Sequence, residues 1–99
     1  MDQMRSYTIN KGMMDSWVKL FETGIKPAHA AMGIPVVATW VNADRNQFIW
    51  VRRFNNENDI PAQELAFRNS PGFQGLGSKP GEHIAKMDVQ SLEQGAFAA

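Results

Sequence analysis

Two arginines set among aromatic residues are the side chains in this sequence best suited to chemistry. Arg5 and Tyr7 alternate in one β-rich stretch, so both face the same side of that strand. Trp50 and Arg52 alternate in a second stretch. A guanidinium group in an apolar cleft needs an anion or a planar acceptor, so this set could bind a carboxylate or enolate above an aromatic floor. The alternative is that each arginine pairs with an internal acid, of which the candidates are Asp15, Glu64 and Asp88.

Tyr7, His29 and Arg52 are the candidate catalytic residues. A phenol such as Tyr7 can donate a proton to a bound oxygen, or it can fill the core with its hydroxyl at the rim. His29 lies near the end of a predicted helix, where the dipole favours its charged form and its titration range suits a general base; the alternative is a surface or capping histidine. His83 precedes the last predicted strand and is expected in a loop. Because the two histidines form no helical ligand pair, we predict no metal and no other cofactor.

Hydrophobic periodicity places these residues on strands and helices. Alternation of apolar residues predicts four strands, at residues 4–10, 36–41, 47–54 and 84–89. Apolar spacings of three and four predict a helix from residue 13 onward, which Gly24 and Pro27 should loosen or kink and Gly33 should end. The strand at 47–54 has two apolar faces, so both should be covered.

A second helix is predicted at residues 60–69, and its expected inward-facing side chains are Ile60, Leu65 and Phe67. Ser70 and Pro71 then begin a short helical segment. Residues 75–81 are rich in glycine and predict a flexible connection, and residues 91–99 predict a tail.

The polar residues 42–46 predict a hairpin turn, which sets the strand that carries Trp40 beside the strand that carries Trp50. With an even number of loop residues, Val41 lies opposite Phe48, and Trp40 shares the face of Ile49. An odd number would reverse the faces.

The order strand, helix, strand, strand, helix, strand predicts an α+β, ferredoxin-like βαββαβ fold. Its four-stranded antiparallel sheet carries two helices on one face. The chain of 99 residues then forms a single domain at 1–99, with a core at about 4–90 and a C-terminal tail at 91–99. The other sheet face would be bare and apolar, so we predict a homodimer through that face, of the dimeric α+β barrel kind.

Composition excludes several other classes of partner. Ten basic and ten acidic residues cancel, so no long-range field favours nucleic acid or an anionic membrane surface. The sequence has no cysteine, which excludes disulfides and thiolate chemistry. It has no signal peptide and no long apolar run, so we expect a cytoplasmic protein.

Several short motifs are similar to landmarks of the NIPSNAP family. The stretch 4–12, Trp40, the stretch 48–54 and the turn 69–73 occur in the family's order and spacing, and together span roughly residues 4–76. The resemblance implies a dimeric α+β barrel, the superfamily of the antibiotic-biosynthesis-type and haem-degrading monooxygenases. It implies no particular reaction, because NIPSNAP members share no agreed chemistry and the animal proteins are discussed as mitochondrial interaction proteins.

Within that superfamily the ligand cleft lies between sheet and helices. The resemblance implies that its wall here carries Arg5, Tyr7, Ile9, Phe48, Trp50, Arg52 and Phe54. Haem-degrading relatives use an asparagine on the first strand and a histidine on the second helix. This sequence has Arg5 at the first position and no histidine in residues 60–76, which argues against haem degradation.

Three hypotheses about function remain open. The first is a protein that binds a small aromatic or anionic molecule in the cleft and uses oxyanion stabilisation for a cofactor-independent monooxygenase-like activity. The second is a non-catalytic dimeric scaffold or interaction protein. The third, an isomerase or ring-cleavage helper, needs Tyr7 or His29 as a base.

Overall fold

The computed structural model describes residues 1–55 and 57–93 of the chain. Its strands are β1 (Asp2–Ile9), β2 (Val36–Val41), β3 (Gln47–Arg53) and β4 (Ile84–Leu92). Between β1 and β2 lie α1 (Met14–Leu20), η1 (Phe21–Ile25) and α2 (Lys26–Ala31). Between β3 and β4 lie η2 (Glu57–Asp59), α3 (Ile60–Arg68), α4 (Pro71–Gln74) and α5 (Lys79–His83).

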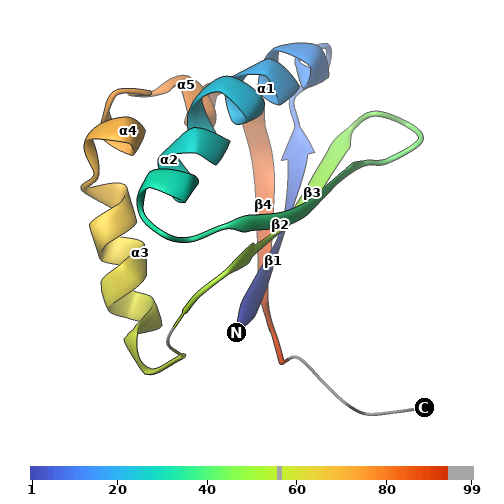
Figure 1. The fold of residues 1–99 in the computed structure, drawn as a ribbon. Coiled ribbons are helices and arrows are strands. Elements are labelled where there is room, and N and C mark those ends of the chain that lie inside the picture. Colours follow the sequence, from blue (N-terminus) through green and yellow to red (C-terminus); the bar gives the residue numbers. More distant parts are fainter. Residues whose placement is uncertain (56, 94–99) are drawn as a thin grey trace, which may run out of the picture.

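The strands form one antiparallel sheet in the order β2-β3-β1-β4, and the helices lie together on one side of it (Figure 1). This is the ferredoxin-like α+β architecture, so the predicted fold class is confirmed. The register places Arg5 of β1 opposite Trp50 of β3, and Tyr7 opposite Phe48. These residues therefore share the face that the helices cover.

The first helical region is continuous, but its winding changes in the middle. η1 is a π-helix, and it lies where Gly24 and Pro27 were expected to loosen the helix. Because Pro27 has no N–H to bond to the preceding turn, the regular ladder is interrupted there, which favours a wider turn. Trp17, Phe21 and Ile25 face inward from this region and form the main core with Tyr7, Ile9, Met14, Phe48 and Trp50.

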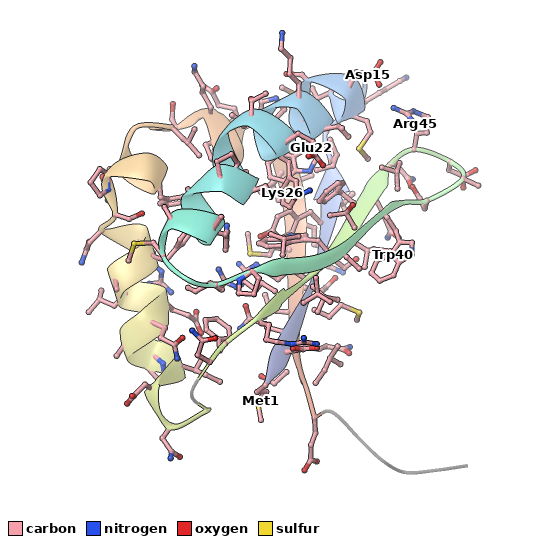
Figure 2. The ribbon with its side chains drawn as sticks, viewed as in Figure 1. Met1, Asp15, Glu22, Lys26, Trp40 and Arg45 are labelled. Carbon is pink, nitrogen blue, oxygen red and sulfur yellow. The ribbon has the colours of Figure 1, made fainter. Side chains whose placement is uncertain are left out.

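The structure decides the register of the hairpin between β2 and β3, which the sequence left open: an even number of residues, 42–47, separates the paired Val41 and Phe48. Trp40 lies opposite Ile49, and Val41 lies opposite Phe48. The Oδ1 atom of Asn42 accepts hydrogen bonds from the backbone N–H groups of Asn46 and Gln47, at 2.9 and 2.8 Å, which closes the turn. Trp40 points away from the helices and is 53% exposed (Figure 2).

The face of the sheet away from the helices has an apolar part and a polar part. Met4, Ile49 and Val51 form its apolar part together with Trp40, on β1, β2 and β3. On β4 the same face is polar, with Lys86, Asp88 and Gln90. The predicted apolar association surface is thus confined to three strands.

α3 forms where it was predicted, but its inward face differs. Leu65 is 57% exposed, so the prediction that it faces inward is wrong. Phe67 is buried, and Glu64 turns toward the sheet, where its carboxylate lies 3.7 Å from Arg52. The inward face of this helix therefore combines the charged Glu64 with Phe67 and the partly buried Ile60, which pack with Ala28, Ile34 and Phe54.

The connection after α3 is more ordered than its glycines suggested. Ser70 caps α4 by accepting a hydrogen bond from the backbone N–H of Phe73 at 3.4 Å, as predicted. Residues 79–83 then form α5, so the prediction of a flexible connection through residue 81 is wrong there. His83 ends α5 and is buried, so its predicted place in a loop is also wrong.

The last strand continues to Leu92 and does not end at Val89. Of the predicted tail, Ser91 and Leu92 therefore belong to β4, and residues 94–99 lie outside the described residues. Within the described ranges, no helix is both long and apolar enough to cross a membrane.

Candidate functional site

A cavity of about 140 Å³ lies between the sheet and the helices. One part of its wall is aromatic and apolar and includes Tyr7, Trp17, Ile25, Trp50, Phe67 and Phe73. The other part is charged and consists of Arg5, Arg52, Glu64 and Arg68. Apolar walls with a few convergent polar groups are typical of small-molecule sites.

Arg5 reaches into this cavity from β1 and bonds only neutral groups. Its Nε donates to the Tyr7 hydroxyl at 2.7 Å, and its Nη1 donates to Oε1 of Gln3 at 2.8 Å. Its Nη2 lies 3.1 Å from the sulfur of Met87, and its guanidinium carbon lies 5.6 Å and 5.9 Å from the ring centroids of Tyr7 and Trp50. No carboxylate of the described residues pairs with Arg5, which leaves this cation available to an anion.

Arg52 is held in place much more firmly. It is 5% exposed, and its Nε donates to Oε1 of Gln3 at 2.9 Å while its Nη1 donates to Nε2 of His29 at 3.1 Å. Its guanidinium also lies over the ring of Phe54, at 5.1 Å. Burial lowers the pKa of Arg52 to about 10, and the nearby charge of Arg5 adds to this effect, so the group stays charged at neutral pH.

His29 is buried, so the alternative of a surface or capping histidine is wrong. Its Nδ1–H donates to the carbonyl oxygen of Ile25 at 2.8 Å, which leaves Nε2 as the acceptor of the bond from Arg52. Burial, with repulsion from Arg52 and Arg5, lowers its pKa to about 4 despite the bond to Ile25. The expectation that the helix terminus favours the charged form is therefore wrong, and both ring nitrogens are occupied.

Glu64 lies between two arginines at the cavity wall. One of its carboxylate oxygens is 3.7 Å from Nη2 of Arg52 and 3.7 Å from Nη2 of Arg68. Of the acids proposed as internal partners, Glu64 is thus the one that pairs with a cavity arginine. Asp15 instead pairs with Arg45 of the hairpin loop (Figure 2).

Two tryptophans that line the cavity have buried indole N–H groups without an acceptor among the described residues. Trp17 and Trp50 are 1% and 2% exposed, and their Nε1 atoms are buried without a hydrogen-bond partner among the described residues. A buried donor without a partner costs about 1–3 kcal/mol, so these two groups reduce the stability of the fold at the cavity wall.

The structure brings Arg5, Tyr7, His29, Trp50 and Arg52 together at the cavity. Three other predicted wall residues do not line it. Ile9 and Phe48 belong to the main core, and Phe54 belongs to a second core with Ala28, Ile34 and Phe67.

Several wall residues were not predicted from the sequence, and Trp17 and Arg68 are two of them. Trp17 was assigned to the core stripe of the first helix, and no local signal distinguishes a core indole from one that also borders a cavity. Arg68 follows Glu64 by one helical turn, and that spacing is a signal that could have indicated the ion pair between them.

Outside the cavity, His83 joins α5 to α1. Its Nδ1–H donates to the carbonyl oxygen of Lys79 at 2.7 Å, and the Ser16 hydroxyl donates to its Nε2 at 2.8 Å. Among the described residues, no three acidic or histidine side chains gather into a metal-binding group.

The family model for NIPSNAP matches residues 2–99. The chain belongs to the NIPSNAP family. A search of curated proteins finds no match. Among solved structures, a NIPSNAP domain protein from Burkholderia xenovorans is similar with a TM-score of 0.85 at 15% identity, covering 99% of this chain and 97% of the other.

Two further solved structures place this NIPSNAP chain in its fold group. A NIPSNAP family protein from Agrobacterium tumefaciens has a TM-score of 0.85 at 16% identity, covering 97% of this chain and 93% of its own. A candidate antibiotic biosynthesis monooxygenase from Bacteroides thetaiotaomicron has a TM-score of 0.76 at 11% identity, covering 95% of this chain and 88% of the other. At these identities the likeness establishes the shared fold.

Proposed function

We propose that this NIPSNAP protein binds a small anionic aromatic molecule in the cavity between its sheet and helices. The observation that supports this most strongly is Arg5, a guanidinium at the cavity wall that pairs with no carboxylate of the described residues. Hydrogen bonds to neutral groups orient this cation over the aromatic rings and leave its charge uncompensated, so it can bind an oxyanion.

The charge of the site supports the same proposal. Arg5, Arg52 and Arg68 line the cavity, and Glu64 is the one carboxylate among its lining residues. His29 stays neutral because its pKa is about 4. The positive excess attracts an anion, and the partly apolar wall strengthens that attraction relative to bulk water.

A monooxygenase-like reaction is a second candidate, favoured by the contact between Arg5 and Tyr7. The Tyr7 hydroxyl accepts its bond from Arg5, so its own proton is left to donate to a bound phenolate or enolate oxygen. Dioxygen would be the oxidant of such an electron-rich substrate. His29 does not fit the role of base, because Arg52 occupies its Nε2.

The oligomeric state is proposed from the opposite face of the sheet. We infer a homodimer that buries Trp40 with the apolar residues of β1 and β3, which leaves the cavity face free for its ligand. A non-catalytic dimeric scaffold would use this face alone, and it would need no available cation in the cavity.

Calorimetric titration with benzoate and with neutral benzamide tests the binding proposal. Benzoate should bind measurably, and benzamide should bind at least tenfold more weakly. Arg5→Met should weaken benzoate by about 10–100-fold, since it removes a charged hydrogen-bond donor. Arg53→Met is the matched control, because Arg53 pairs with Asp2 and does not line the cavity. No benzoate binding, or equal losses in both variants, would favour the scaffold.

A further inference from the structure

We propose that Met87 is an oxidation-sensitive residue that regulates anion binding in the cavity. A peroxide converts its thioether into a sulfoxide, and the new oxygen then competes with the ligand for the guanidinium group of Arg5. This inference rests on the proposed function and names a means of regulating the same site.

The contact between Arg5 and Met87 connects the cavity to a methionine at the protein surface. Nη2 of Arg5 lies 3.1 Å from the sulfur of Met87, and both residues line the cavity. Met87 lies on β4 opposite Tyr7 of β1, so its side chain is on the same face of the sheet as Arg5. A change at this sulfur therefore acts directly on the cation that the proposed ligand needs.

The acceptors that surround Arg5 differ in strength. Its Nε donates to the Tyr7 hydroxyl at 2.7 Å and its Nη1 to Oε1 of Gln3 at 2.8 Å. Its Nη2 faces the thioether sulfur of Met87, which is a weak acceptor. An incoming oxyanion displaces the weakest of these three partners at the lowest cost. The N–H that faces Met87 is therefore the one that Arg5 most readily transfers to a ligand.

Oxidation replaces this weak acceptor by a strong one. A sulfur lone pair attacks one oxygen of hydrogen peroxide, and the S–O bond forms as the O–O bond breaks. The departing hydroxide takes up the proton of the transferred oxygen and leaves as water, so the sulfur loses the two electrons that the peroxide gains. The product is a polar sulfoxide, whose oxygen accepts the N–H of Nη2 and holds it against the ligand.

Met87 is accessible to a peroxide in solution. The residue is 45% exposed, and its contact with Arg5 lies in the exposed part of the structure. Met32, at 37%, is the other methionine among the exposed large apolar side chains of the described residues, and it does not line the cavity. The two methionines thus offer the same chemistry to a peroxide and differ in their contact with Arg5.

Treatment with hydrogen peroxide, followed by calorimetric titration with benzoate, tests the inference. Peptide mass spectrometry should find one added oxygen atom on Met87. The oxidised protein should bind benzoate about fivefold or more weakly, because the ligand must displace a stronger acceptor from Arg5. Methionine sulfoxide reductases of both stereospecificities should restore the affinity. In Met87→Leu, peroxide should leave the affinity of that variant unchanged, whereas Met32→Leu, the matched control, should show the full loss.

A second variant tests the acceptor without any oxidant. Met87→Gln carries an amide oxygen on a side chain of similar length, so it should weaken benzoate binding in the untreated protein. This comparison excludes effects of peroxide on other side chains of the chain.

Three results would overturn the inference while leaving the proposed function standing. The first is unchanged benzoate affinity in protein whose Met87 is oxidised. The second is a peroxide effect that persists in Met87→Leu, and the third is oxidation of Met32 with Met87 left intact. If benzoate does not bind the unoxidised protein, the proposed function fails and this inference fails with it.

Discussion

Replacing Arg52 by methionine should destabilise the fold, whereas the same replacement at Arg5 should mainly affect anion binding. Arg52 is buried and donates to Gln3 and His29, which are themselves 7% and 1% exposed. Gln3 keeps its hydrogen bond from Arg5, but Nε2 of His29 is left buried without a donor. Loss of the two charged hydrogen bonds corresponds to about 3 kcal/mol of unfolding free energy. For a chain of this length that is a fall in Tm of about 15 °C.

Arg5 should behave differently, because its bonds are partly exposed and its charge has no acidic partner to lose. We expect Arg5→Met to lower the free energy of unfolding by less than about 1 kcal/mol. Urea unfolding followed by tryptophan fluorescence, with the m value compared between variants, measures both changes.

Equal losses of stability in the two variants would contradict this difference between Arg52 and Arg5. An Arg52→Met variant as stable as the parent chain would contradict it as well. The first result would mean that Arg5 supports the fold as Arg52 does, and it would remove the ground for treating Arg5 as the cation available to a ligand.

Three other changes have definite expected outcomes. Burial depresses the pKa of His29 to about 4, so as the pH falls its imidazole is protonated in the unfolded chain before it is protonated in the folded one. The free energy of unfolding should therefore fall by about 3 kcal/mol from pH 6.5 to pH 4. In urea titrations at each pH, the free energy of unfolding of His29→Gln should depend less steeply on pH over this range. Glu64→Gln should raise benzoate affinity by about 3–10-fold, because it removes one repelling negative charge from the cavity wall, and unchanged calorimetric affinity would contradict this. Trp40→Lys should give monomers in light scattering if the apolar face is the dimer interface, and a monomeric parent chain would exclude that interface.

Much of the fold was predictable because its signals are local. The polar residues 42–46 predicted the hairpin that sets the strand carrying Trp40 beside the strand carrying Trp50, but they left the parity of its loop open. Alternation on β1 and β3 then placed Arg5, Tyr7, Trp50 and Arg52 on one face. Every second residue of a strand faces the same side of the sheet, and this alternation alone predicts which side chains share a face.

The errors fall where tertiary contacts override local pattern. Leu65 was expected on the inward face of α3, but it is exposed, and its neighbour Glu64 lies toward the sheet, where it pairs with Arg52. His83 was expected in a loop, but bonds to Lys79 and Ser16 hold it in α5. Neither partnership can be read from spacing in one sequence.

His29 is an intermediate case. It lies four residues after Ile25 and eight after Phe21, so the apolar stripe of the first helix already pointed to a buried position. Its bond from Arg52 joins residues 23 positions apart, and only the fold brings them together. The burial was therefore predictable from sequence, and the occupied Nε2 was not.

Two-dimensional ¹⁵N NMR of the three indole N–H groups during a benzoate titration tests the central claim most directly. If the aromatic acid enters the cavity beside Arg5, the Trp17 and Trp50 signals should shift and saturate together, while the Trp40 signal on the far face stays in place. Shifts confined to Trp40, or none at saturating benzoate, would contradict the account.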